Sequence, residues 1–230
     1  MVKKIVITGA GGILGKACIT SFQKKGHQIV AILSPGKKLS YTTISPVSVY
    51  NADLMDESNT QEVMDQVIKD HQTIDTALLL VGGFAMGTIN NTDGTLIKKM
   101  ISLNFETAYY SARVLFNQMA KQKDGGKIVF VGSRPSLDAK AGKGVLAYAL
   151  SKTLVFKLAE ILNEEGKEKN IVSSVFVPSI IDTPDNRKAM PKTNTDLWVK
   201  PEDIAEIMEF ATSEKGMALR EPVIKVYGKS

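Results

Sequence analysis

The chain has little of what builds metal sites and disulfides: it contains one cysteine, Cys18, and two histidines, His27 and His71. A lone cysteine excludes an internal disulfide, and the three residues do not show the spacing of zinc ligands. We therefore expect no metal site.

Long hydrophobic runs are also absent. The longest apolar stretch, Ala77 to Met86, contains two glycines and is much shorter than the roughly 20 residues that a membrane-spanning helix needs. The segment from Met1 to Thr8 lacks the apolar region and the small-residue cleavage site of an export signal. We therefore expect a cytoplasmic protein with no membrane partner.

Clustered basic residues are missing too, although 29 Lys and Arg against 24 Asp and Glu give a net charge of +5. The longest basic runs are pairs such as Lys3-Lys4 and Lys37-Lys38. Because a nucleic-acid site needs a concentrated basic face, we expect a solvated surface and no nucleic-acid partner. With 43% hydrophobic and 23% charged residues, the chain has the composition of a globular protein.

Short β-branched and aliphatic runs alternate with longer segments of helical periodicity. This alternation is typical of βαβ units, which form a parallel sheet with right-handed crossovers. The predicted strands cover residues 3–8, 28–33, 47–50, 74–81, 127–132, 171–177 and 223–227, and the predicted helices cover 12–25, 58–71, 92–121, 145–165 and 201–212. Residues 182–196 are expected to form a loop. The prediction is an α/β fold of one domain over residues 1–230: a doubly wound, seven-stranded parallel sheet with helices on both faces.

The first predicted strand ends in a glycine-rich turn that leads directly into a helix. Glycine lets the backbone approach a pyrophosphate, and the amides at a helix amino terminus favour its charge. In an open α/β sheet, ligands bind at the carboxyl ends of the strands. The turn therefore predicts a dinucleotide site; the alternative is a glycine-rich turn without a ligand. Its candidate residues are Gly9, Gly11, Gly12, Ile13, Leu14 and Gly15.

A second motif, Tyr148-Ala149-Leu150-Ser151-Lys152, lies on a predicted helix, where residues four apart share a face. A phenol with a pKa of about 10 is a weak acid–base catalyst at neutral pH, and a nearby ammonium lowers that pKa. Tyr and Lys at this spacing also occur by chance, so the pair becomes specific only beside the other motifs.

Together these motifs resemble the short-chain dehydrogenase/reductase family, whose members are single Rossmann-fold domains that bind NAD(P) and carry the catalytic residues themselves. The resemblance implies hydride transfer between nicotinamide and a carbonyl or alcohol, or a C=N bond, of a small-molecule substrate. It implies Tyr148 as proton donor and Lys152 as the residue that tunes Tyr148 and holds the nicotinamide ribose. Ser133 would orient the substrate, with Ser136 as an open alternative, and Asn104 would belong to a proton relay.

The same resemblance extends the cofactor site. Asp53, with Leu54 after it, would bind the adenine, and Gly82 and Gly83 would let the backbone approach the cofactor ribose. Pro178, Ile181 and Thr183 would surround the nicotinamide. The glycine spacing of the first turn and the stretches 81–85 and 182–191 are locally similar to dihydropteridine reductases. Ser133 departs from those enzymes and suits an ordinary ketone or alcohol.

Cofactor choice depends on the end of the second predicted strand. NAD-specific relatives carry an acid there that repels a 2′-phosphate, whereas this chain has Leu33, followed by Ser34 and Lys37. We therefore expect NADP(H) to be preferred, with NAD(H) possible; the alternative is that the lysine only solvates a turn. Helices 92–121 and 145–165 imply, by resemblance, a homodimer or homotetramer.

A rival function is a dinucleotide-binding sensor that keeps the fold without turnover. Fold alone does not exclude it. The set of Asn104, Ser133, Tyr148 and Lys152 argues against it, because a sensor has no need of a proton donor. Asn104 has its own alternative, a core asparagine bonded to the backbone.

Overall fold

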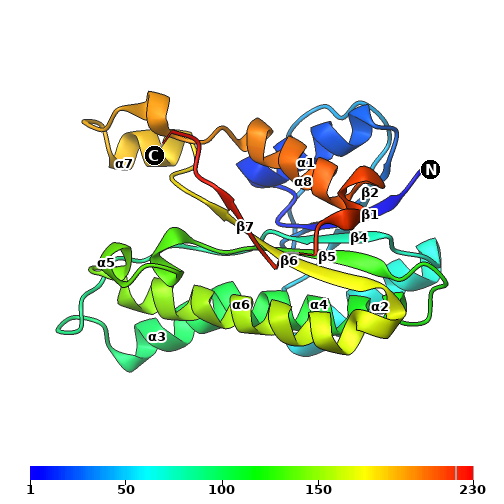
Figure 1. Cartoon of the computed structure of the whole chain (residues 1–230), viewed down its shortest axis with the longest axis horizontal. Helices are drawn as coiled ribbons and strands as arrows, with labels where there is room; N and C mark the ends of the chain where they lie inside the picture. The colour runs from blue at the N-terminus through cyan, green and yellow to red at the C-terminus, as the bar shows by residue number, and fades with distance from the viewer. Residues whose placement is uncertain (221, 230) are drawn as a thin grey trace.

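A central parallel sheet with helices on both faces makes up the protein (Figure 1). The computed structural model describes residues 1–220 and 222–229. Within them the strands are β1 Lys4–Thr8, β2 Gln28–Leu33, β3 Ser48–Asn51, β4 Thr76–Leu79, β5 Gly126–Val131, β6 Ile171–Pro178 and β7 Val223–Val226. Every neighbouring pair is parallel, in the order β3-β2-β1-β4-β5-β6-β7. The predicted doubly wound, seven-stranded sheet is confirmed.

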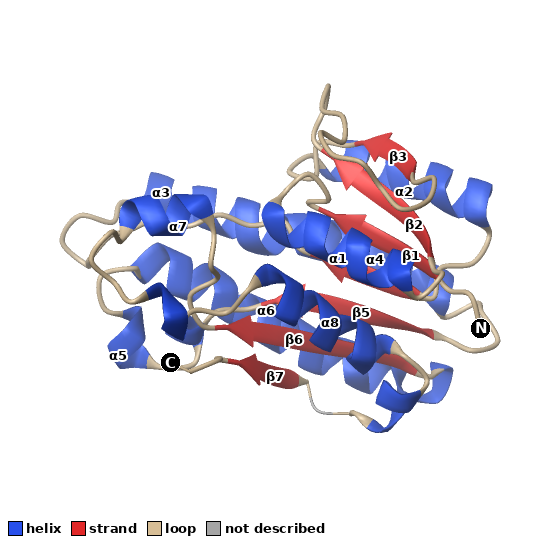
Figure 2. Ribbon diagram, turned by 90° about the horizontal axis from the view of Figure 1, so that it is seen from above, coloured by secondary structure: helices blue, strands red, loops and turns tan. Residues whose placement is uncertain are grey.

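The helices form a layer on each side of this sheet (Figure 1). One layer contains α1 Ile13–Lys24 and α8 Pro201–Thr212, and the other contains α2 Glu57–His71, α4 Thr107–Met119 and α6 Leu146–Gly166. The short helices α3 Gly94–Ile101, α5 Ala139–Gly142 and α7 Pro184–Ala189 lie toward the carboxyl ends of the strands (Figure 2). Short 3-10 turns cover Arg134–Ser136, Lys167–Lys169, Thr195–Leu197 and Lys215–Ala218. No helix in the described residues is long and apolar enough to cross a membrane.

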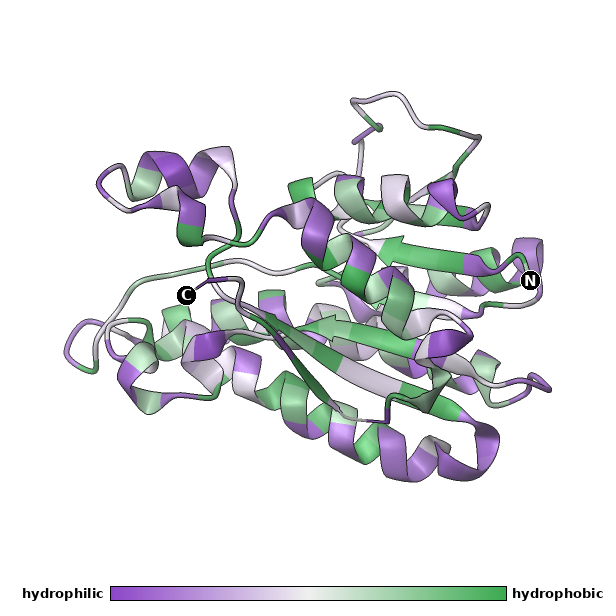
Figure 3. Cartoon of the chain, turned by 45° about the horizontal axis from the view of Figure 1, so that its top comes forward, coloured by the Kyte–Doolittle hydropathy of each residue, from purple (hydrophilic) through white to green (hydrophobic). Residues whose placement is uncertain are grey.

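The two faces of the sheet have separate cores, because successive side chains of a strand point to opposite sides. On β1, Val6 packs into the core under α2, α4 and α6, whereas Ile5 and Ile7 pack into the core under α1 and α8. Most of the sheet is accordingly hydrophobic in Figure 3. Fully burying a side chain such as Phe130 or Phe176 contributes about 1.5–3 kcal/mol.

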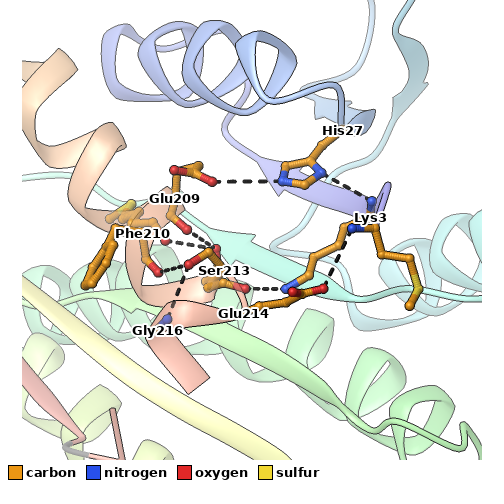
Figure 4. A network of polar contacts seen from close by, with 10 residues as sticks. Lys3, His27, Glu209, Phe210, Ser213, Glu214 and Gly216 are labelled. Atoms are coloured by element: carbon orange, nitrogen blue, oxygen red, sulfur yellow. Dashed lines mark hydrogen bonds and ion pairs between the residues drawn. The ribbon is translucent and has the colours of Figure 1, made fainter. Parts of the chain in front are cut away.

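A polar network ties the end of α8 to the start of β1 (Figure 4). The Lys3 backbone N–H donates to His27 Nδ1 at 3.2 Å, and His27 Nε2 lies 4.0 Å from Glu209 Oε1. Lys3 Nζ donates to the carbonyl oxygen of Thr212. Burial lowers the pKa of His27 below its ordinary value, although Glu209 acts in the opposite direction. This network lies at the amino edge of the sheet, so it stabilises the fold away from the carboxyl edge.

The helix predicted over residues 92–121 is observed as a continuous helical run from Gly94 to Met119, but it contains a π-helical turn that was not predicted. The segment divides into α3, a π-helical turn at Ser102–Glu106 and α4. Asn104 lies inside the π-helical turn, and its side chain bonds to the backbone of Gly83. A π-helical turn interrupts the regular hydrogen-bond ladder and is frequent at functional sites.

Other predicted boundaries also change. Residues 182–196 are not all loop, because Thr183 caps α7 by accepting a hydrogen bond from Asn186 N at 3.2 Å and Pro184 starts the helix. The strand predicted at 74–81 ends at Leu79, because the next N–H, that of Leu80, donates to Thr8 Oγ1 at 3.0 Å. Helix α5 was not predicted.

The order of the strands places the site. β1 pairs with β2 on one side and with β4 on the other, so the connections that follow these strands diverge. A crevice forms at such a switch point, outside the carboxyl ends of the strands. The glycine-rich turn after Thr8 and the Gly82-Gly83 pair after β4 both lie at this place.

Candidate active site

The glycine-rich turn brings α1 directly onto the end of β1. Gly9 has a φ of +65°, which favours glycine. A Cβ atom on Gly15 would lie only 2.4 Å from the Gly9 carbonyl oxygen, so any side chain there would push the helix away from the strand. The turn therefore needs these two glycines for its own geometry.

The start of α1 fits an anionic group. Gly12 is the N-cap residue and has no side chain to cap the helix, which leaves the first-turn N–H groups of Ile13 and Leu14 without a capping partner. Gly11, Gly12 and Ile13 are exposed. Open amides at the positive end of a helix are suited to a pyrophosphate, so these residues fit the dinucleotide that the sequence predicts.

The side chains of Asn104 and Lys152 are buried and pack closely against the two glycines after β4, of which Gly82 is exposed and Gly83 is half-buried. Gly83 N donates to Asn104 Oδ1 at 2.8 Å, and Asn104 Nδ2 donates to Gly83 O at 3.1 Å. A Cβ atom on Gly82 would lie 2.7 Å from Asn104 Oδ1 and 2.9 Å from Lys152 Nζ. A side chain at position 82 would therefore displace Asn104 or Lys152 from its observed place. The Asn104 amide makes the backbone bonds expected of a core asparagine.

Lys152 is buried on α6, and its Nζ donates to the carbonyl oxygen of Val131 at 2.8 Å. Burial lowers the pKa of Lys152 from 10.5 to about 8. Burial raises the pKa of Tyr148, and a hydrogen bond with the Ser133 side chain acts in the opposite direction. The net direction is upward because loss of solvation outweighs the Ser133 contact. The lowering of this pKa by Lys152 stays a prediction.

Two serines follow β5 and lie together. Ser133 Oγ is 2.7 Å from Ser136 Oγ, and Ser136 Oγ donates to the carbonyl oxygen of Ala149 at 3.0 Å. Ser136 thus reaches both Ser133 and the helix that carries Tyr148. The structure brings both serines together at this place, and Ser133 as the residue that orients the substrate, with Ser136 as the alternative, stays a prediction.

The segment after β6 is held by local bonds. Pro178 ends β6, and Thr183 Oγ1 caps α7. The Ile181 carbonyl oxygen accepts from Asn186 Nδ2 at 2.8 Å, and Ile181 forms a bridge with Val199. The predicted nicotinamide residues therefore lie on an ordered strap at the carboxyl edge of the sheet.

The remaining predicted cofactor residues lie at or just after the carboxyl ends of β2 and β3. Leu33 is buried at the end of β2, whereas Ser34 and Lys37 are exposed just after it. Asp53 is exposed and its Oδ1 accepts from Met55 N at 3.1 Å, so part of its carboxylate serves its own turn. Leu54, next to Asp53, is buried in the core.

Comparison with known proteins decides the family. The family model described as short chain dehydrogenase matches residues 3–194. The chain belongs to the short-chain dehydrogenase family.

Relatives of this chain include reductases of different kinds. The dihydropteridine reductase of Dictyostelium discoideum is 25% identical, over 100% of this chain and 96% of the relative. The 3-oxoacyl-(acyl-carrier-protein) reductase FabG of Thermotoga maritima is 23% identical, over 98% of this chain and 96% of the relative. A solved structure of ElxO with NADP bound has a TM-score of 0.90 at 21% identity and covers 99% of this chain and 98% of that one. The short-chain dehydrogenase fold therefore extends over nearly the whole chain.

One residue of this short-chain dehydrogenase site was missed in the sequence. Ser151 is fully buried, accepts from Asn104 Nδ2 at 3.0 Å and donates to the Tyr148 carbonyl oxygen at 2.9 Å. It joins the π-helical turn to the first turns of α6. Its place between Tyr148 and Lys152 was the available signal, because a serine there faces the interior with its neighbour Lys152.

Proposed function

We propose that the protein is an NAD(P)-dependent reductase of small carbonyl or C=N compounds, with Tyr148 as the proton donor. The observation that supports this most directly is that Ser133, through Ser136, reaches the helix that carries Tyr148, and that Lys152 is buried on the same helix. A dinucleotide at the glycine-rich turn, held by Gly9, Gly11, Gly12, Ile13, Leu14 and Gly15, would extend along the carboxyl edge toward these residues.

Each side chain has a chemical task in this proposal. The cofactor, when bound, supplies the hydride. Tyr148 keeps its proton at neutral pH because its pKa is raised, so it can protonate the substrate heteroatom as a general acid. Ser133 orients that heteroatom, and the Lys152 amine stabilises the phenolate that forms and holds the nicotinamide ribose. Asn104 keeps the backbone of Gly83 in place, as its two hydrogen bonds indicate, and contributes to a proton relay.

A substrate panel tests turnover against the rival function of a sensor. We would follow the loss of reduced nicotinamide absorbance with a quinonoid dihydropterin, a β-ketoacyl thioester and simple aryl and alkyl ketones. The first two compounds correspond to the relatives in Dictyostelium and Thermotoga. Turnover that is lost in Tyr148→Phe supports the proposal. Cofactor binding without hydride transfer to any compound would favour the sensor.

NADPH is proposed as the preferred cofactor. No acid stands at the end of β2, where Leu33 is buried, and Lys37 is exposed four residues later. A preference of about tenfold corresponds to only about 1.4 kcal/mol, which one partly screened lysine–phosphate contact supplies. Titrating both reduced cofactors at low and high salt tests it, because added ions should shrink the preference. Tighter binding of NADH in both conditions would overturn the assignment.

A homodimer or homotetramer that pairs through α4 and α6 is the proposed assembly. An apolar groove of about 450 Å³ runs between α4 and α6 and is lined by Phe105, Tyr109, Phe116, Leu154, Leu158 and Ile161, among others. The side chain of Ile161 is 47% exposed and that of Leu154 is 38% exposed. Exposed apolar faces of this kind mark contact surfaces, and a second copy offers the same two helices in return.

Charge placed in the groove tests the dimer. Wild-type protein should sediment as a dimer or a tetramer at micromolar concentration, and Leu154→Glu with Ile161→Glu should sediment as a monomer. Ile207→Glu on α8 is the matched control, since Ile207 is similarly exposed outside the groove. A monomeric wild type would contradict the proposal.

A further inference from the structure

The segment that follows β2 is a tight and well-defined turn. Ser34-Pro35-Gly36-Lys37 closes with a hydrogen bond from Lys37 N to Ser34 O at 3.1 Å, and Gly36 has a φ of +71°. Proline at the second position and glycine with positive φ at the third are the pattern of a type II turn. The turn therefore has one preferred backbone shape.

Asn51, at the end of β3, is bonded to both ends of this turn. It pairs in register with Leu33. Its Nδ2 donates to Ser34 O at 2.7 Å and to Lys37 O at 3.0 Å. Asn51 is exposed, so its side chain does not contribute to the core. One amide group thus joins the first and last carbonyls of the turn and holds the turn against the sheet.

The turn lies next to the glycine-rich turn. A Cβ atom on Gly11 would lie 3.4 Å from Leu33 Cδ2, so the end of β2 contacts the segment that fits the pyrophosphate. β1 and β2 are neighbours in register from Lys4 to Thr8. Leu33 therefore borders the proposed dinucleotide site. Ser34 and Lys37 come directly after Leu33 in the chain, on the side where the adenosine would bind.

We propose that Asn51 is a positioning residue that sets the preference for a 2′-phosphorylated cofactor. This inference rests on the proposed use of NADPH. With the turn fixed by Asn51, the hydroxyl of Ser34 and the amine of Lys37 are presented together to the phosphate. Without Asn51 the turn would keep its shape but would no longer be held against the sheet, and the entropy cost of placing it on binding would weaken the phosphate contact. NADH has no 2′-phosphate, so its affinity does not depend on this order.

Direct binding measurements test the inference without turnover. Trp198 is the only tryptophan, and its neighbour Val199 pairs with the Ile181 strap, so energy transfer from Trp198 to the reduced nicotinamide reports binding. In Asn51→Ala we expect NADPH to bind about three- to tenfold more weakly, as for loss of a preorganised contact, with NADH affinity unchanged. Asn51→Asp should lower NADPH affinity further, because a carboxylate adds repulsion to the loss of both donors.

A double variant shows whether Asn51 acts through Lys37. Lys37→Ala should reduce the preference for NADPH, and adding Asn51→Ala should then change the ratio of the two dissociation constants little, because coupled residues are not additive. Asn91→Ala is the control: Asn91 Oδ1 also holds a loop, by accepting from Thr88 N, but lies on another segment. In Asn91→Ala the ratio of the NADPH and NADH dissociation constants should equal that of the wild type.

Three outcomes would overturn the inference, and they separate its failure from that of the proposed function. If Asn51→Ala weakens both cofactors equally, the role of Asn51 is only structural. If its effect adds fully to that of Lys37→Ala, Asn51 does not act through the turn. If the wild type binds NADH more tightly, the NADPH assignment falls together with the inference, whereas failure to bind either cofactor would reject the proposed function itself.

Discussion

Ser133 Oγ lies 2.7 Å from Ser136 Oγ, and Ser136 Oγ donates to the Ala149 carbonyl oxygen on the helix that carries Tyr148. A hydroxyl has one proton to donate. With its proton on the Ala149 carbonyl oxygen, Ser136 must accept from Ser133. The pair thus forms a directed chain in which Ser136 orients Ser133.

The two serines should therefore differ when replaced. In Ser133→Ala, kcat/KM should fall about 10²-fold, within the range for losing one group that orients or stabilises the reacting oxygen. Ser136→Ala should reduce kcat/KM less, by about threefold to tenfold, because it only loosens Ser133. Steady-state kinetics on the best substrate of the panel decide this, with cofactor affinity as the control. An equal loss in the two variants would reject separate roles.

Tyr148→Phe removes the transferable proton and keeps nearly all of the volume. Turnover should fall by about 10²- to 10⁴-fold, the usual contribution of general acid catalysis, while the cofactor dissociation constant changes little. Energy transfer from Trp198 measures cofactor binding, and nicotinamide absorbance measures turnover. Wild-type turnover in this variant would show that another group donates the proton.

Lys152 should make stability depend on pH. Its pKa falls from 10.5 to about 8 on folding, so between these values the unfolded chain binds more protons, and stability rises with pH. The difference corresponds to about 3 kcal/mol, present above pH 10.5 and lost as pH falls through 8. Lys152→Met should flatten the rise measured by urea unfolding from pH 7.5 to pH 10.

Lys127→Met is the matched control for this measurement. Burial also lowers the pKa of Lys127 to about 8, but this side chain is only partly buried, and it donates to Ala211 and Gly216 at the amino edge. The contribution of Lys152 should persist in this variant. Equal slopes in the wild type and Lys152→Met would contradict the prediction. Lys152→Met should also weaken cofactor binding, since Lys152 is proposed to hold the ribose.

Gly82→Ala should damage both the fold and the site. Its Cβ would lie within 3 Å of Asn104 Oδ1 and Lys152 Nζ, so at least one of these two side chains would have to shift. Displacing these two groups should lower turnover at least about tenfold. Gly94→Ala is the control, because a Cβ there meets no atom within 4 Å. Thermal unfolding and steady-state kinetics compare Gly82→Ala with Gly94→Ala. Wild-type stability and turnover in Gly82→Ala would show that Asn104 and Lys152 can shift without loss of function.

The sequence by itself determined the parallel sheet, the glycine-rich turn and the spacing of Tyr148 and Lys152. These are local properties, because strand and helix periodicity, the backbone freedom of glycine and a four-residue spacing on a helix all act within one segment. Helix α7 was also within reach, since Thr183 and Pro184 carry a local start signal, but the polar composition of residues 182–196 concealed it.

Only the tertiary structure decided how the site is held. The helix predicted over 92–121 is interrupted at Asn104, whose partner Gly83 is 21 residues away in the chain. Asn51 meets the turn at Ser34 from a different strand. The raised pKa of Tyr148 follows from burial under residues distant in sequence. Such contacts and the loss of solvent depend on which elements meet in space, and no periodicity within a single segment encodes that.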